Sequence, residues 1–146
     1  MERRKFIRAL CSTCISATAI SLLGTGCTAT KYIPGKMEKD GLRIRKEDFR
    51  QGTGTAYSSF IIVRNEALLF PICVFRLAEN EYSAVWMKCT HQGATLNASG
   101  DMLQCPAHGS EFDNRGRVSN GPAISNLRSF PVTLQKDELF IDLRKQ

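Results

Sequence analysis

Histidine is scarce in this chain, whose 146 residues include only His91 and His108. The two histidines lie 17 positions apart, and each stands close to a cysteine. Any site that needs a third histidine is therefore excluded. If His91 and His108 bind a metal, no histidine is left for a catalytic triad, so a histidine-based triad in addition to such a metal site is ruled out. The same count also rules out an additional iron site with two histidines and one carboxylate.

Other classes are excluded by what the remaining sequence does not contain. Beyond residue 30, no stretch has the sustained 3.6-residue hydrophobic period of a helix. The glycines of Gly52-Thr-Gly54 lack the lysine and the following helix of a phosphate-binding loop, so they are expected to form a turn. The formal net charge is +6, but the first eight residues contribute +3 of it. No basic stripe with interleaved aromatic residues is present, and we expect no nucleic-acid partner.

The six cysteines do not have the even, regular spacing of a disulfide framework. Cys11, Cys14 and Cys27 fall in an N-terminal apolar stretch, and Cys73 lies in a strand-like run. Cys73 is expected to behave as a small buried hydrophobe. Cys89 and Cys105 are the two that stand beside the histidines.

The N-terminus has the pattern of an export segment. Residues 1–8 are basic, and no charge follows from Ala9 to Thr30. The pair Arg3-Arg4, followed by a lysine and two apolar residues, resembles a twin-arginine signal, a class of bacterial export signal. We expect residues 1–27 to form this signal or an anchor and residues 28–41 to form a spacer. The domain is then exported from a bacterial cytoplasm, to the periplasm or to the outer face of the inner membrane.

Three fates of the N-terminal segment stay open. The residues before Cys27 resemble a bacterial lipobox imperfectly, because Gly24 stands where a leucine is usual. The uncharged stretch is long enough to cross a bilayer, although it is rich in small and polar residues. A lipoprotein anchored at Cys27 is preferred, an uncleaved anchor comes second, and release as a soluble protein is third. The first two attach the domain to the membrane.

The remaining chain reads as a small all-β domain over residues 42–146. Alternating or β-rich runs occupy residues 42–46, 59–63, 68–77, 82–87, 130–134 and 139–143. Pro71 interrupts the third run, which suggests an edge strand or a bulge. Asn65-Glu66 suits a tight turn before that run, and residues 135–138 suit a hairpin turn.

Two short motifs gather all the histidines with two cysteines. Cys89-Thr-His91 is followed, after thirteen residues, by Cys105-Pro-Ala-His108. Two thiolates and two imidazoles are the ligands of a two-iron cluster with mixed ligation, and equally of a structural zinc site. Zinc fingers pair cysteine with cysteine in sequence, whereas each pair here is mixed. The backbone features Gly93, Pro106 and Gly109 suit loops that closely approach an inorganic core, which also favours the cluster.

The same residues carry a family resemblance. Cys89-Thr-His-Gln-Gly93 followed by Cys105-Pro-Ala-His-Gly-Ser-Glu-Phe112 resembles the signature of the Rieske iron–sulfur family, over about residues 42–146. The resemblance implies three small antiparallel sheets with a cluster-binding subdomain. It implies one [2Fe–2S] cluster per chain, with Cys89, His91, Cys105 and His108 as ligands. Ser110 matches a serine that donates to a bridging sulfide, and Pro122 matches a proline loop that covers the cluster.

Two departures distinguish this chain from the Rieske proteins of quinol-oxidising cytochrome bc complexes. Those proteins have a disulfide where Ala94 and Ala107 stand, and a tyrosine where Phe112 stands. In this respect the chain looks more like the Rieske ferredoxins of dioxygenase systems. With one of two side-chain donors present, we expect a reduction potential between the extremes of the family range, which spans about −150 to +300 mV.

The resulting expectation is one-electron transfer on the outer side of a bacterial membrane, without a substrate site of the chain's own. Once four ligands are assigned, no histidine remains as a base, and no nucleotide-binding glycine motif is present. The partners are then redox proteins, a cytochrome among the candidates. The alternative is an electron-transfer subunit of a larger oxidoreductase, either cytochrome bc-like or a molybdenum enzyme. A zinc-stabilised binding module is a remote alternative.

Overall fold

The computed structural model describes residues 30–144, and their architecture is almost entirely β. A five-stranded sheet has the order β1 (Tyr32–Pro34), β4 (Phe60–Arg64), β5 (Ile72–Ala78), β6 (Glu81–Trp86) and β11 (Ser129–Phe130). A four-stranded sheet has the order β12 (Val132–Gln135), β13 (Glu138–Asp142), β3 (Gly41–Arg45) and β2 (Lys36–Glu38). The third sheet has the order β10 (Val118–Asn120), β9 (Glu111–Asp113), β8 (Met102–Gln104) and β7 (Asn97–Ser99).

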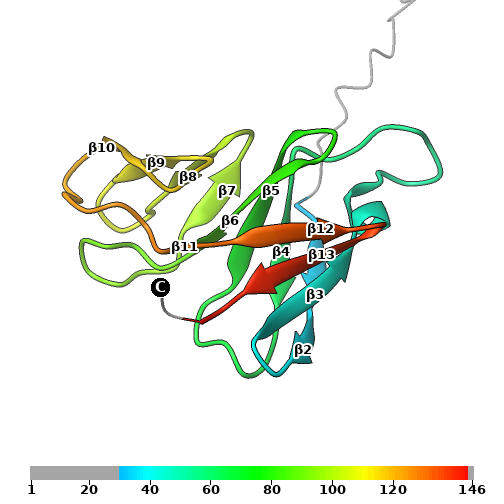
Figure 1. Ribbon diagram of the computed structural model, residues 1–146. Coiled ribbons are helices and arrows are strands. Elements are labelled where there is room, and N and C mark those ends of the chain that lie inside the picture. Colours follow the sequence, from blue (N-terminus) through cyan, green and yellow to red (C-terminus); the bar gives the residue numbers. More distant parts are fainter. Residues whose placement is uncertain (1–29, 145–146) are drawn as a thin grey trace, which may run out of the picture.

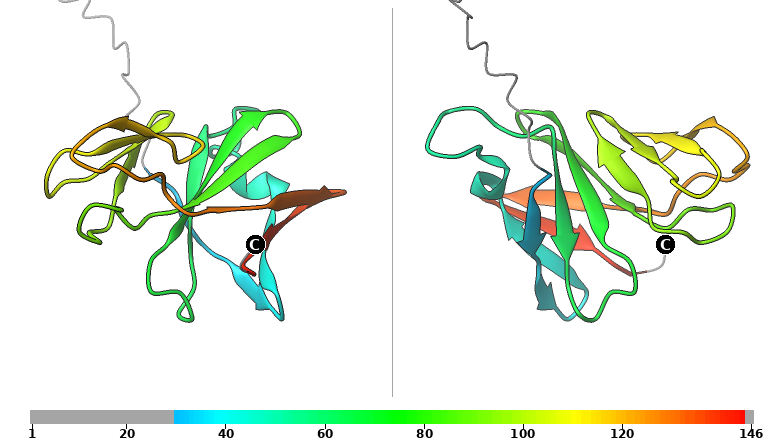
Figure 2. Two further views of the ribbon diagram at one scale, coloured as in Figure 1. Left: turned by 60° about the vertical axis from the view of Figure 1, so that its left-hand side comes forward. Right: turned by 180° about the vertical axis from the view of Figure 1, so that it is seen from behind.

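The predicted fold class, three small sheets with a separate subdomain, is confirmed. Strands β7–β10 form a lobe to one side of the other two sheets (Figure 1), and the views in Figure 2 show this lobe standing apart from them. One pair differs from the expectation of antiparallel sheets, because β1 runs parallel to β4. A single short 3₁₀ helix, η1 (Lys46–Phe49), follows β3.

The main core lies between the five-stranded sheet and the sheet that contains β3 and β13, and it follows from alternation along their strands. In β3 and β13 the apolar side chains at alternate positions are buried, so that Leu42 and Ile44 share a core with Leu139 and Ile141. Strand β4 contributes Ile61 to the same core. Alternating burial on one face is what a half-covered antiparallel sheet produces.

A second core supports the β7–β10 lobe. It contains Cys89, Cys105 and Phe112 together with Val85 of β6. Cys73 is fully buried in the same core, and burial raises the pKa of its thiol well above the ordinary value. Cys73 therefore behaves as the small hydrophobe that the sequence suggests.

The folded domain extends into the range expected as a spacer. Strands β1 and β2 lie within residues 28–41, and Ile33 is buried in the main core. These strands have only three residues each, too few to show a period in the sequence.

The edge strand suggested by Pro71 is not found, because β5 is an interior strand of its sheet; the register of β5 against β6 does shift, but between Arg76 and Ala78, away from the proline. Pro71 comes just before the first residue of that strand, so its missing N–H removes no hydrogen bond between paired strands. Its carbonyl accepts a hydrogen bond from Met87 N–H at 3.0 Å.

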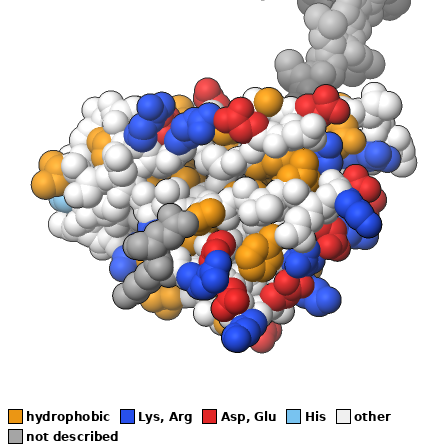
Figure 3. Space-filling view, viewed as in Figure 1, with side chains coloured by type: hydrophobic (Ala, Val, Ile, Leu, Met, Phe, Trp, Pro, Cys, Tyr) orange, Lys and Arg blue, Asp and Glu red, His pale blue; other side chains and the backbone are white. Residues whose placement is uncertain are grey.

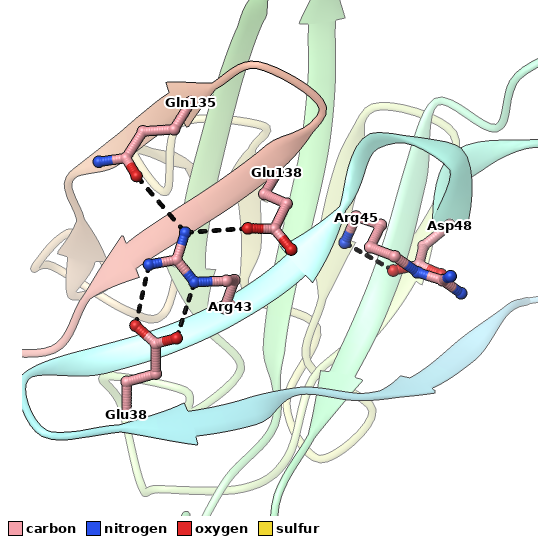
Figure 4. A network of polar contacts seen from close by, with 6 residues as sticks. All are labelled: Glu38, Arg43, Arg45, Asp48, Gln135 and Glu138. Carbon is pink, nitrogen blue, oxygen red and sulfur yellow. Dashed lines mark hydrogen bonds and ion pairs between the residues drawn. The ribbon is translucent and has the colours of Figure 1, made fainter.

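A polar network crosses the outer face of the sheet that contains β3 (Figure 4). Arg43 donates from Nε and Nη2 to the carboxylate of Glu38, at 2.7 and 2.9 Å, and from Nη1 to Glu138 at 3.2 Å. These contacts join strands β2, β3 and β13 in the order that the sheet requires. Hydrogen bonding to Arg43 lowers the pKa of the Glu38 carboxyl.

The expected signal, anchor and Cys27 lipidation fall on residues 1–27, which lie outside the described part of the chain. Within residues 30–144, no helix has the length and apolar character needed to cross a membrane.

Candidate metal centre

Three loops of the β7–β10 lobe carry the residues singled out by the sequence motif. The first loop, residues 87–96, joins β6 to β7, and the second, residues 105–110, joins β8 to β9. The third loop, residues 121–128, leads from β10 back to β11 in the five-stranded sheet. The fold therefore brings the two halves of the motif together by pairing β8 with both β7 and β9.

The first two loops have the same backbone frame. In the first, Gly93 N–H donates to the Cys89 carbonyl at 2.9 Å, and Cys89 N–H donates to the Ala94 carbonyl at 2.8 Å. In the second, Gly109 N–H donates to the Cys105 carbonyl at 3.0 Å, and Cys105 N–H donates to the Ser110 carbonyl at 2.8 Å. Each cysteine is thus fixed at the start of a tight loop that closes on the glycine four residues later.

The motif side chains separate by chemical type. Cys89 and Cys105 are each 2% exposed, whereas His91 and His108 are exposed. The two imidazole rings lie edge to face with their centroids 5.0 Å apart. Figure 3 shows an imidazole at the tip of the molecule, in a region of this face that is poor in charged side chains. The thiols therefore lie in the lobe core and the imidazoles at its surface.

The surroundings of Cys105 favour the thiolate that binds metal. Burial raises the pKa of the Cys105 thiol, but the backbone N–H groups of Ala107 and His108 and a contact with the Cys89 thiol outweigh this effect. The pKa of Cys105 consequently lies below its ordinary value. Backbone donors directed at a cysteine sulfur also stabilise a negatively charged metal–thiolate unit.

The third loop is fastened to both motif loops. Ala123 N–H donates to the hydroxyl oxygen of Ser110 at 3.0 Å, and Ser110 is fully buried. The Thr90 hydroxyl donates to the Ser125 carbonyl at 2.6 Å. A hydroxyl that accepts one hydrogen bond still has its own hydrogen to donate. Ser110 therefore binds the third loop as a hydrogen-bond acceptor, and its O–H group can still donate a hydrogen bond.

The remaining predicted residues lie around the same loops. Phe112 is fully buried in β9 and belongs to the same lobe core as the two cysteines. Pro106 is exposed in the second loop, and Pro122 is exposed in the third, after a cis peptide bond from Gly121. The sequence does not indicate a role for Thr90, because a hydroxyl contact with a carbonyl 35 residues away leaves no local signal.

The four motif residues fit a two-iron cluster. Within residues 30–144, no group of three or more His, Cys, Asp or Glu side chains surrounds a single metal position. The four form two pairs instead, a buried thiol pair and an exposed imidazole pair. A [2Fe–2S] centre with mixed ligation takes two cysteines on one iron and two histidines on the other.

Comparisons with known proteins agree with this chemistry. The family model described as "Rieske [2Fe-2S] domain" matches residues 45–131. The cytochrome b6-f complex iron-sulfur subunit of Synechococcus sp. (strain CC9605) is 36% identical over 55 residues, which are 36% of this chain and 31% of that protein. The ubiquinol-cytochrome c reductase iron-sulfur subunit of Cereibacter sphaeroides is 42% identical over 69 residues, 43% of this chain and 35% of that protein.

A solved structure supports the same relationship. The plasma membrane Rieske protein PetC3 from Synechocystis PCC 6803 matches with a TM-score of 0.51 and 26% identity, over 57% of this chain and 86% of that one. The match to the two curated relatives, in contrast, spans only about a third of their length.

Proposed function

The chain belongs to the Rieske [2Fe–2S] domain family, and on that premise we propose that it transfers single electrons on the outer side of a bacterial membrane. The domain binds one [2Fe–2S] cluster per chain, and family membership selects this cluster over the zinc alternative. We assign the ligands as Cys89 and Cys105 on one iron and His91 and His108 on the other. The observation that carries the assignment is the separation of buried thiols from exposed imidazoles across two matched loops.

When bound, the cluster supplies a reversible one-electron couple. The chain's own residues hold it and set its surroundings. Gly93 and Gly109 close the two loops tightly around their cysteines, and the N–H groups after Cys105 favour the thiolate form. Ser110, buried and with its O–H uncommitted, would supply a donor to the cluster. His91 and His108 would connect the cluster to solvent or to a partner.

The chain works as an electron carrier or as a subunit, without a substrate site of its own. The named curated relatives are iron–sulfur subunits of cytochrome complexes, which supports a subunit role with a cytochrome partner. Ala94, Ala107 and Phe112 replace a disulfide and a hydroxyl, which favours a carrier outside the quinol-oxidising branch. Purifying the chain from native membranes under mild detergent distinguishes the two roles, because a subunit co-purifies with a cytochrome in fixed ratio.

Placement outside the cytoplasm and attachment to the membrane belong to this proposal. They are supported by the basic, twin-arginine-like start and by the uncharged stretch that contains Cys27. Replacing Arg3-Arg4 with two lysines should retain the protein in the cytoplasm. Labelling with a radioactive fatty acid, compared between the natural chain and the Cys27→Ser variant, tests the lipid.

The ligand assignment is tested by cluster content. The full chain is expected to contain two irons and two sulfides and to give a rhombic EPR signal after dithionite reduction. Cys105→Ser and His108→Leu should each lose the signal. Cys73→Ser is the matched control, because Cys73 is a buried cysteine of the same core that is outside the ligand set. Zinc in stoichiometric amount without an EPR signal would end the proposal.

A further inference from the structure

A groove of about 750 Å³ runs from the first motif loop toward the five-stranded sheet. Its lining includes Trp86, Lys88, His91, Gln92, Ser125 and Arg128. No Asp or Glu occurs among its lining residues, all of which belong to the described part of the chain. We call this hollow the basic groove. It begins at one of the two exposed imidazoles.

The two cations of the basic groove are held in place by aromatic rings. Lys88 Nζ lies 5.6 Å from the centroids of both the Phe70 and the Trp86 rings. Arg128 Cζ lies 5.7 Å from the Trp86 centroid and 4.6 Å from that of Phe130. Trp86 is itself fixed, because its Nε1–H donates to the Phe70 carbonyl at 3.1 Å. Cations ordered over rings lose less conformational entropy on meeting a ligand.

Neither cation is neutralised within residues 30–144. No ion pair there involves Lys88 or Arg128, although Arg45, Arg115, Arg117 and Arg144 each pair with a carboxylate. Arg128 donates one hydrogen bond, from Nη2 to the Leu143 carbonyl at 2.8 Å. A guanidinium has five N–H donors, so Arg128 retains the capacity to bind a carboxylate.

The rest of the lobe tip is without charge. Residues 89–96, 105–110 and 119–127 contain no Asp, Glu, Lys or Arg. Ile124, in the third loop, is 96% exposed. This uncharged tip has one projecting apolar side chain and is bordered by two cations that form no ion pair within the described residues. Such a composition is that of a protein contact with a charged edge.

We propose that the basic groove receives the acidic edge of a redox partner protein, whose carboxylates pair with Lys88 and Arg128 while its redox centre approaches His91. The inference rests on the proposed function, since it places the partner beside a ligand imidazole. A hollow next to that imidazole suits a protruding protein edge better than a flat anionic membrane. Attraction between opposite charges also speeds encounter and fixes the orientation of the pair.

The first test measures the local field without any electron transfer. Trp86 is the only tryptophan of the chain and lines the basic groove, so quenching of its fluorescence reports the charge there. In the holoprotein, iodide should quench more strongly than caesium. The ratio of the two quenching constants should fall about twofold in Lys88→Gln/Arg128→Gln at low ionic strength.

The matched control is Lys136→Gln/Arg50→Gln, which removes the same charge elsewhere. Lys136 lies in the turn between β12 and β13, which is at the opposite side of the domain from the β7–β10 lobe (Figure 1). Arg50 lies near the same turn, because it lines a hollow together with Asp137. The control should keep the quenching ratio of the natural chain. An equal loss in both double variants would overturn the proposal, because net charge alone would then explain the preference.

The second test uses a protein partner of defined charge. A c-type cytochrome is compared before and after succinylation, which converts lysine ammonium groups into carboxylates. One electron passes from the reduced holoprotein to the ferric haem, and stopped-flow absorbance follows both. The succinylated form should react faster, and this preference should fall about fivefold in Lys88→Gln/Arg128→Gln but not in the control.

The possible negative results distinguish the proposed function from the inference about the basic groove. A chain without an EPR-active cluster ends the proposed function. A chain with a reversible cluster but no preference for the succinylated cytochrome ends only the inference about the basic groove. Vesicles of phosphatidylglycerol and of phosphatidylcholine give the remaining outcome. If Lys88→Gln/Arg128→Gln weakens binding to the anionic vesicles while cytochrome rates stay unchanged, the groove faces a membrane and the proposal is overturned.

Discussion

Gly93 and Gly109, 16 positions apart, occupy equivalent positions in the two loops on either side of the β7–β8 hairpin. Each stands four residues after a proposed cysteine ligand and donates its N–H to the carbonyl of that cysteine. Their φ angles are 76° and 78°, in the left-handed region that side chains disfavour. The two halves of the motif therefore have the same backbone hydrogen bond and the same glycine conformation. Their histidines differ in position, because they stand two and three residues after the cysteine.

Substituting either glycine should have nearly the same cost. A Cβ on Gly109 meets nothing within 4 Å, and one on Gly93 meets only Lys88 Cε at 3.4 Å. The cost of Gly93→Ala and of Gly109→Ala therefore comes from the backbone, at about 1–2 kcal/mol each. Urea denaturation of the holoproteins measures it. Gly100→Ala, at a left-handed turn residue of the β7–β8 hairpin, provides the comparison for φ strain away from the motif.

The Ser110 hydroxyl should tune the cluster's reduction potential. Replacing Ser110 with Ala removes a buried O–H and also the acceptor of Ala123 N–H. We expect a lower potential with the cluster retained, because a donor to the cluster stabilises its more negative, reduced form. Ser110→Thr retains the hydroxyl and should return most of the potential. A protein-film or EPR-monitored redox titration decides; equal potentials for all three proteins would show that the hydroxyl points elsewhere.

Asp113 should make the lobe sensitive to acid. Its Oδ1 accepts from the N–H groups of Arg115 and Arg117 at 2.9 Å, and its Oδ2 from Arg117 Nε at 2.7 Å. Partial burial raises the pKa of the carboxyl, but these hydrogen bonds outweigh burial and lower it. A lowered pKa in the folded state contributes stability above the unfolded value of about 4, and this stability is lost as the pH falls through the folded value.

The Asp113→Asn variant should therefore be less stable than the natural chain by about 1 kcal/mol at neutral pH. This difference should shrink as the pH falls below about 4. Thermal unfolding across pH 3–7 measures it. Asp101→Asn, at the exposed turn of the β7–β8 hairpin, should show no such change. A difference that stays constant down to the lowest pH would exclude the carboxylate as its source.

A substitution at the far end of the domain should stabilise it. Lys136 has a φ of 57° in the two-residue turn between β12 and β13. Asparagine tolerates this conformation better than lysine, so Lys136→Asn should add about 0.5 kcal/mol to the free energy of unfolding. Urea midpoints measure the gain, and a lower midpoint would contradict it. Cluster content should not change, since this turn is remote from the β7–β10 lobe.

The sequence predicts most of what depends on local pattern. Leu42 and Ile44 alternate with charged residues, and that period gives a half-buried strand. The motif residues are predicted together because their spacing is itself the signal. Cys73 stands in an apolar run, and its burial follows from that run. Each of these features can be read within a short window of residues.

What the sequence does not predict is set by contacts across long separations. Lys88 and Arg128 stand 40 positions apart, and each alone looks like an ordinary surface cation. Lys88 follows Trp86 by two residues, and the return of the third loop to β11 brings Arg128 to the same ring. Strands β7–β10 have three residues each, which is too short for a hydrophobic period. Their pairing is determined by the lobe core and not by local propensity.

The separation of buried cysteines from exposed histidines has a consequence for the order of events in turnover. Both proposed imidazole ligands lie at one surface, with their ring centroids 5.0 Å apart, so electrons would enter and leave the cluster through the same small surface. An electron donor and an electron acceptor that both need this surface cannot bind to it at the same time. The first partner must leave, or the domain must swing away from it, before the second can dock. A carrier of this kind would alternate between partners, and the lifetime of each encounter would then contribute to its turnover time.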